Sequence, residues 1–270
     1  MLAIKNPLSL YDLGSPVAGN LEVIIASRPE QIEAAQRLRY RVFCEEMGAK
    51  PSSEIELSKR DRDKFDDVCD HLLVVERQEN GDAIVVGTYR LLRREAMEKV
   101  GRFYSEGEYD MSAINNYQGE ILEVGRSCVD PGFRNRAVMQ LLWRGIGAYV
   151  ARFEIALMFG CASFHGTNPA THAMALSYLH HYHLAPENLR PKALPERYID
   201  MNLMPKDRVI VKKAFASLPA LIKGYLRLSG YIGLGAVIDP EYNTTDVSIV
   251  VKTNLVTEKY AQRYGTPSDV

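Results

Sequence analysis

The stretch "EVGRSCVDPGFRNRAVMQLLWRGI", Glu123 to Ile146, changes its pattern half-way along. Its first part has the apolar and β-branched residues of a strand, and its last part begins a helix over 137–153 with an apolar stripe at helical spacing. Between them lies a basic turn, Phe133-Arg134-Asn135-Arg136. A basic turn ahead of a helix N-terminus is suited to holding an anion. The stretch therefore predicts a strand–turn–helix unit with an anion site at its junction.

The sequence on both sides alternates between strand and helix patterns. Two β-rich runs around Asn80-Gly81-Asp82 predict a hairpin, because Asn-Gly favours the tight turns that join antiparallel strands. The other expected elements are a strand over 21–27, a helix over 29–48, a buried strand over 155–164, a helix over 168–182 and strands within 235–253. This order predicts an α/β fold, a mixed twisted sheet flanked by helices.

Domain boundaries follow from composition. Residues 1–20 are expected to form a flexible N-terminal arm, 21–260 a single domain and 261–270 a tail. Within the domain, 218–235 has amphipathic character, with Lys223 and Arg227 opposite an apolar face. These charges exclude a membrane-spanning prediction. The face is expected either to lie at a membrane surface or to pack on the core and line a tunnel for an acyl chain.

Composition restricts the function classes. The 270 residues are 46% hydrophobic and 25% charged, with a net charge of −1, so a nucleic-acid binder with its basic excess is not expected. The N-terminus lacks the apolar core of a signal peptide, which favours the cytoplasm. No two of the four cysteines form a CxxC motif, and the histidines within 165–183 have no partner set for a metal, so we expect free thiols and no metal site.

The order of elements resembles the GNAT acyltransferase fold, in which a loop and helix N-terminus hold the phosphopantetheine or pyrophosphate of an acyl donor. The run "RNRAVMQ" differs from the usual glycine-rich loop of that fold. Four segments, "LRYRVFCEEMGA", "FDDVCDHLLVV", "GTYRLL" and "EVGRSCVDP", resemble the successive signatures of acyl-homoserine-lactone synthases. The matching residues are Arg39, Phe43, Asp67, Asp70, Arg90, Glu123 and Arg126. Ala49 and Gly125 depart from a tryptophan and a Ser or Thr of that family, which implies a different acceptor.

A further resemblance covers roughly 21–260. The segments "MFGCASFHGTNP" and "LPALIKGYLRLSGYIGLGAVIDPEYNTTDV" are similar to bacterial ornithine–acyl carrier protein N-acyltransferases. The resemblance implies an acyltransferase that moves a 3-hydroxyacyl chain from acyl carrier protein to the α-amine of L-ornithine, forming lyso-ornithine lipid. The phosphopantetheine thioester would be a co-substrate, and no bound cofactor or metal is implied. The location would be cytoplasmic, with attachment to the inner membrane as a further expectation.

Each acceptor-side residue has a structural alternative. Glu123 is predicted to be the base that takes a proton from the amine, but it could be an ion-pair partner of Arg126 on the same strand. Asp67 and Asp70 are predicted to bind an ammonium, or else to be solvated. The arginines and Phe43 complete the predicted substrate site, in which Arg90 or Arg126 binds the acceptor carboxylate. Arg39 could instead be a surface residue.

The donor side is predicted at the opening stretch. Arg134, Asn135 and Arg136 are expected to receive the phosphodiester of phosphopantetheine, with a solvated basic turn as the alternative. The fold resemblance implies that a backbone N–H near Val129 polarises the thioester carbonyl. Cys128 beside this strand could form an acyl-enzyme, but no Cys–His signature accompanies it, so direct transfer is favoured.

Two other functions stay open from the sequence. One is a GNAT acyltransferase that uses acyl-CoA or another amino acid acceptor. The other is a non-catalytic, membrane-active protein of the hemolysin-like kind. A lytic protein should show amphipathic segments along its length, whereas this chain shows one, in 218–235.

Overall fold

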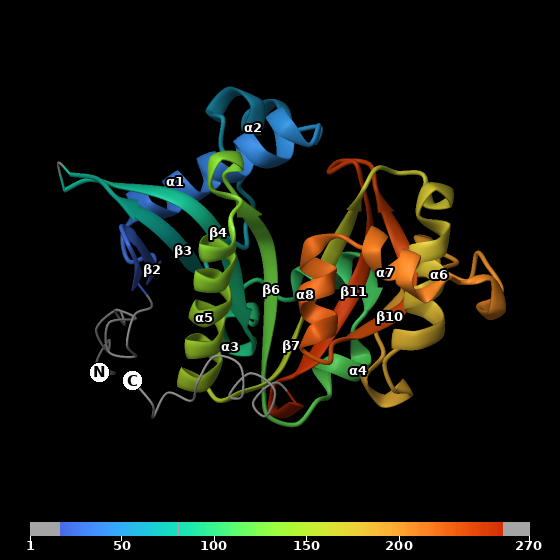
Figure 1. Ribbon diagram of the computed structural model, residues 1–270. Coiled ribbons are helices and arrows are strands. Elements are labelled where there is room, and N and C mark those ends of the chain that lie inside the picture. Colours follow the sequence, from blue (N-terminus) through green and yellow to red (C-terminus); the bar gives the residue numbers. More distant parts are fainter. Residues whose placement is uncertain (1–16, 80, 256–270) are drawn as a thin grey trace.

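The computed structural model describes residues 17–79 and 81–255, and it confirms the predicted mixed sheet flanked by helices (Figure 1). The strands are β1 (Val17–Ala18), β2 (Leu21–Ile25), β3 (Asp70–Arg77), β4 (Ala83–Arg93), β5 (Tyr109–Asp110), β6 (Glu120–Val129), β7 (Ile155–His165), β8 (Lys192–Ala193), β9 (Tyr198–Ile199), β10 (Tyr231–Asp239) and β11 (Thr244–Lys252). The helices are α1 (Pro29–Tyr40), α2 (Ser53–Ser58), α3 (Arg94–Met97), α4 (Ser112–Asn115), α5 (Arg136–Arg152), α6 (Ala173–His183), α7 (Val211–Ser217) and α8 (Ala220–Arg227).

The strands run in the order β1-β2-β3-β4-β6-β7-β11-β10-β8-β5, with β9 paired to β10. Alternate residues of β3 show how the sheet is covered. Leu72 and Val74 lie in the core cluster under α5, whereas Leu73 and Val75 lie in the cluster under α1. Because successive side chains of a strand point to opposite faces, α5 and α1 cover opposite faces of this half of the sheet. Figure 1 shows α5 and α8 on the near side, one over each half.

The two halves of the sheet separate between β6 and β7. These strands are parallel and pair only from Glu120 to Glu123, after which β6 stays with β4 and β7 with β11. At the branch, a Cβ on Gly160 would lie 2.1 Å from the carbonyl oxygen of Val124, so only glycine permits this approach. Figure 1 shows the strands diverging beyond this point.

Strand β6 also contains a bulge. Thr88 pairs with Cys128 and Arg90 pairs with Gly125, so β6 has one more residue than β4 between these pairs. Arg126 lies in the bulge with a φ of 50°, in the left-handed region. A bulge redirects the side chains of its strand, and it does so here where the two halves of the sheet separate.

The segment 218–235 forms helix α8 and the first half of β10. Its apolar side packs inward: Leu218, Ile222 and Tyr225 are buried, and Tyr225 makes an edge-on contact with Trp143 of α5. Of the two sequence-based alternatives, packing on the core is the one that the structure describes. Within 17–79 and 81–255, none of the helices combines the length and apolar character needed to cross a bilayer.

Some element boundaries differ from those predicted from the sequence, and others lie outside the described residues. The helix expected over 29–48 is α1 followed by a π-helical turn, Arg41–Glu46. Residues 17 and 18 of the expected flexible arm form β1, which pairs with β2. Asn80 of the hairpin turn, the rest of the arm (1–16) and the tail with its approach (256–270) lie outside the described residues, so their predictions stay predictions.

Candidate active site

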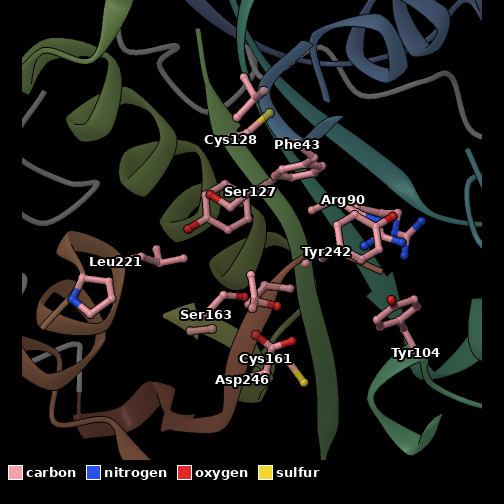
Figure 2. Close-up of a pocket in the computed structure, with 18 of the residues that line it drawn as sticks. Phe43, Arg90, Tyr104, Ser127, Cys128, Cys161, Ser163, Leu221, Tyr242 and Asp246 are labelled. Carbon is pink, nitrogen blue, oxygen red and sulfur yellow. The ribbon is translucent and has the colours of Figure 1, made fainter. Parts of the chain in front are cut away.

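A cavity of about 570 Å³ occupies the gap between the diverging strands. Val124–Val129 of β6 line one side and Cys161–Ser163 of β7 the other. Figure 2 shows Leu221 at one end and Arg90, Tyr104 and Tyr242 at the opposite end. The apolar end is completed by Met139, Pro219, Ala220 and Tyr225. The cavity thus has one end suited to an apolar chain and one suited to a charged molecule.

Glu123 lies on the cavity wall and is 5% exposed. Its carboxylate accepts hydrogen bonds from the backbone N–H groups of Tyr104 and Ser105, both at 2.7 Å, and from the Ser105 hydroxyl at 2.5 Å. Burial raises the pKa of Glu123, and these hydrogen bonds oppose the shift. The carboxylate therefore anchors the turn Tyr104–Gly107 rather than pairing with Arg126, which was its structural alternative.

The predicted arginines converge in a network with aspartates. Arg39 is fully buried and donates to both carboxylate oxygens of Asp66, at 2.9 and 2.7 Å, and to Asp61 at 2.7 Å. A fourth N–H group of Arg39 donates to the carbonyl of Asp61. Arg39 does not line the cavity, so its place in the structure is that of a support. The surface alternative for Arg39 is wrong, because the side chain is enclosed.

Arg90 and Arg126 extend this network to the cavity. Arg90 pairs with Asp63 at 2.7 Å, and Arg126 pairs with Asp63 at 3.2 Å. The Arg126 guanidinium also lies over the rings of Tyr104 and Tyr242, at 4.8 and 4.4 Å from their centroids. Its buried Nε has no hydrogen-bond partner among the described residues, although an Asp61 oxygen is 3.6 Å away. Arg126 therefore has unused capacity to donate into the cavity.

The structure does not bring Asp67 and Asp70 to the cavity. Asp67 is exposed, and Asp70 accepts a hydrogen bond from Tyr149 on α5 at 2.5 Å. The carboxylates of the network are Asp61, Asp63 and Asp66, which the sequence reasoning missed. A signal was present, because Asp63 and Asp66 have the same spacing of three as Asp67 and Asp70.

A second group of acids was missed entirely. Glu108, Asp239 and Asp246 are buried, and one oxygen of each lies within 4.8 Å of the others. Burial raises the pKa of Glu108 to about 7 and that of Asp246 to about 6. Asp239 and Asp246 line the cavity. Such a group can hold a cation, either an ammonium or a metal ion. We call Glu108, Asp239 and Asp246 the acidic trio.

The predicted donor residues lie at the start of α5. Asn135 caps the helix by accepting from the Val138 N–H at 3.1 Å. Arg134 forms a bidentate pair with Glu46, at 2.5 and 2.6 Å, and its Nε donates to the carbonyl of Val129. Arg136 is exposed and has no ion pair within the described residues. Arg134 and Val129 line the cavity, whereas Asn135 and Arg136 lie outside its lining.

Two further predicted residues face the cavity or border it. Phe43 lines it and makes an edge-on contact with Tyr242. Cys128 lines it too, but burial raises the pKa of its thiol to about 12. A thiol, rather than the nucleophilic thiolate, is then present at neutral pH, which favours direct transfer over an acyl-enzyme at Cys128. A Cβ on Gly125 would meet no atom within 4 Å, so this position leaves space in the cavity.

The chain is similar to one family model and to several known proteins. The family model described as "Acetyltransferase (GNAT) domain" matches residues 38–144. An L-ornithine N(alpha)-acyltransferase of Brucella abortus (strain 2308) is 46% identical over 260 residues, which cover 93% of this chain and 91% of the relative. An L-ornithine N(alpha)-acyltransferase of Rhodobacter capsulatus is 42% identical, with 90% and 94% covered. The solved structure of an N-acyl amino acid synthase from uncultured soil microbes aligns with a TM-score of 0.49 at 12% identity, covering 90% of this chain and 95% of that one.

Proposed function

This chain belongs to the L-ornithine N(alpha)-acyltransferase family and is an acyltransferase of the GNAT type, and we propose that it acylates the α-amine of L-ornithine. The donor in this proposal is a 3-hydroxyacyl chain on acyl carrier protein, and the product is a lyso-ornithine lipid. One observation carries the proposal: one cavity joins an apolar end, the gap between β6 and β7 and a charged end.

The acceptor is proposed to lie at the charged end. Its carboxylate is bound by Arg126, whose Nε has no hydrogen-bond partner among the described residues, with Arg90 beside it. A guanidinium matches a carboxylate in shape and charge. Phe43 and the ring of Tyr242 border this end and restrict how the acceptor can turn.

The donor is proposed to enter from the start of α5. Its phosphodiester would lie by the exposed Arg136 and the N-terminus that Asn135 caps, and its thioester would reach the gap beside Val129. The acyl chain would then run along Met139, Leu221 and Tyr225. In this arrangement a backbone N–H of β6 polarises the thioester carbonyl.

The proton route is proposed to run through Ser105. The α-ammonium of ornithine gives a proton to Ser105 Oγ as the hydroxyl proton passes to Glu123, 2.5 Å away. The neutral amine then attacks the thioester carbonyl carbon. The C–N bond forms, the C–S bond breaks, and the second amine proton goes to the departing thiolate. The products are the amide and the holo-carrier thiol.

Incubation with defined donors tests this function. The protein is mixed with 3-hydroxyacyl carrier protein, or with acyl-CoA of the same chain, and with ornithine, norvaline or glycine. Mass spectrometry should find N-acylornithine made from the carrier protein. If N-acylornithine is not formed, the proposal that ornithine is the acceptor is wrong. Equal use of acyl-CoA would overturn the carrier protein as the specific donor.

Substitutions test the proton route. Glu123→Gln and Ser105→Ala should each lower kcat roughly 100-fold or more, the range of a general base. Glu106→Gln is the matched control, because Glu106 anchors the same turn by accepting from the Phe103 N–H at 2.6 Å but does not line the cavity. Turnover like that of the wild type in Glu123→Gln at neutral pH would exclude Glu123 as the base.

Attachment to the membrane surface stays a prediction. The buried apolar residues of α8 are not available for it. The exposed pair Ile210 and Val211, next to Lys212 and Lys213, is better suited, because apolar residues beside cations bind anionic lipid. Sedimentation with anionic vesicles would test this.

A further inference from the structure

The acidic trio is assembled from distant segments. Glu108 follows the turn that Glu123 anchors, Asp239 ends β10 and Asp246 lies in β11. They are 4%, 8% and 6% exposed. Buried carboxylates normally have cationic partners or a full set of hydrogen bonds. The partners present around the trio therefore decide what it can do.

The partners around the trio do not balance its charge. Arg197 is the nearest cation, with its Nη1 3.9 Å from a Glu108 oxygen, and it donates its hydrogen bonds to the carbonyls of Gly107 and Ile238. One oxygen of Asp239 accepts from the backbone N–H groups of Glu241 and Tyr242, at 2.8 and 3.0 Å. A Glu108 oxygen also accepts a hydrogen bond from the Cys161 thiol at 3.3 Å. Among the described residues, the three carboxylates thus share one guanidinium.

Unsatisfied atoms point from the trio into the cavity. Oδ1 of Asp246 and Oγ1 of Thr244 are buried, and neither makes a hydrogen bond of good geometry among the described residues, although the hydroxyls of Ser163 and Thr244 lie close enough to Asp246 to oppose the rise of its pKa. Both residues line the cavity. Figure 2 shows Asp246 beside Ser163 and Cys161, away from the arginine end. A buried acceptor without a partner, next to space, is what a donor ligand would satisfy.

We propose that the acidic trio binds the side-chain ammonium of the acceptor and thereby selects a diamino acid over a neutral one. This inference rests on the proposed function for the identity of the acceptor. An ammonium has three N–H donors, and the trio offers an acceptor from each of three residues. Arg126, Asp239 and Asp246 line the same cavity, with Glu108 beside the two aspartates, so the carboxylate and the distal ammonium of one ligand have separate sites of opposite charge.

Acceptor selectivity is the measurement that tests the site. The ratio of kcat/KM for ornithine over norvaline, which lacks the distal amine, should fall roughly 10- to 150-fold in Asp246→Asn and in Asp239→Asn, the range for a lost charged hydrogen bond. Asp67→Asn is the control, since Asp67 is exposed and does not line the cavity, and its ratio should not change. An unchanged ratio in the trio variants would overturn the proposal.

A binding measurement separates this inference from the proposed function. Ornithine and 1,4-diaminobutane are titrated into the donor-free protein by calorimetry. Both should bind the wild type, and both should bind at least 10-fold more weakly to Asp246→Asn. This result would stand even if ornithine were not acylated. Absence of binding to the wild type, or equal binding to the variant, would overturn the ammonium site.

A divalent cation is the competing ligand for three carboxylates. The protein is dialysed against chelator and its metal content is measured. The proposal would be overturned in favour of a metal site by two results together. The protein would contain one metal ion per chain, and acyl transfer would be lost on chelation and restored by that ion. If chelation does not change the selectivity for ornithine over norvaline, the result supports an ammonium as the ligand of the trio.

Discussion

Two charged regions border the same cavity, and they differ in balance. In the arginine network, three guanidiniums face three carboxylates, from Arg39, Arg90, Arg126, Asp61, Asp63 and Asp66. In the acidic trio, three carboxylates face one guanidinium within 17–79 and 81–255, that of Arg197. The charges of the network therefore balance one another, and the charges of the trio do not. The contrast separates side chains that neutralise one another from side chains whose charge is not balanced.

The difference also sets opposite responses to pH. Arg39 pairs with Asp66 and holds the pKa of that carboxyl below its ordinary value. The pKa of Asp246 is raised to about 6 by burial, with Asp239 adding repulsion. A lowered carboxyl pKa adds stability that is lost as pH falls, whereas a raised one lowers stability as pH rises. The network should favour the fold at neutral pH, and the trio should oppose it.

The largest effect is expected from breaking the network at Asp66. Asp66→Asn removes the charge that Arg39 and Arg90 face in a buried site, so the free energy of unfolding should fall by about 3–5 kcal/mol. Urea denaturation at pH 7 measures it. Asp67→Asn, one position along the chain and exposed, is the control and should change little. A loss in Asp66→Asn as small as that of the control would show that the network does not support the fold.

A smaller effect, of opposite sign, is expected from the trio. Asp246 is buried beside Glu108 and Asp239, with Arg197 as the nearest cation. As pH rises from about 4 to 7, the unfolded chain loses this proton before the folded chain does, so the wild type loses stability. At pH 8, Asp246→Asn should therefore be more stable than the wild type by on the order of 1–3 kcal/mol.

Urea denaturation of the ligand-free protein at pH 4, 6 and 8 measures this difference. The stability difference should become small near pH 4, because Asp246 is protonated in the folded state there and the unfolded chain, with an ordinary pKa of 3.8, has lost only part of this proton. At pH 8, added 1,4-diaminobutane should reduce the stability difference between the variant and the wild type, because an ammonium bound to the wild type balances the negative charge of the trio. A variant less stable than the wild type at pH 8 would show that Asp246 has structural partners and that the contrast with the network is wrong.

The sequence was sufficient for the local parts of the fold. The strand–turn–helix unit of 120–152 was predicted because its pattern and its cap lie in one stretch. Hairpin strands β3 and β4 were predicted from the turn between them. The separation of β6 from β7 was not, because it depends on the contact of Gly160 with Val124, and no local pattern encodes that contact.

The site was predictable in part, for a similar reason. Arg90, Glu123 and Arg126 lie in the paired strands β4 and β6, the resemblance to known motifs predicted them as site residues, and all three line the cavity. The network acids lie in an irregular loop, where several aspartates have the same spacing and only burial distinguishes them. The trio comes from three distant segments, and a sequence pattern cannot show that their carboxylates meet.

The smallest effect is expected outside the cavity, where the start of α5 repeats the contrast between paired and unpaired charges. Arg134 is paired with Glu46, whereas Arg136 is exposed at the first position of the helix. A cation there is unfavourable for the helix dipole, and in the proposed function Arg136 faces the acidic acyl carrier protein instead. At low salt, Arg136→Glu should raise the KM for the acyl carrier protein about 3- to 10-fold and leave kcat unchanged, since a charge at a rim mainly affects association.

Arg152→Glu, exposed in the last turn of α5, is the matched control and should have a smaller effect. Raising the salt concentration should raise the KM of the wild type toward that of the variant. If both variants respond alike, or if salt has no effect, the carrier protein does not dock at the start of α5.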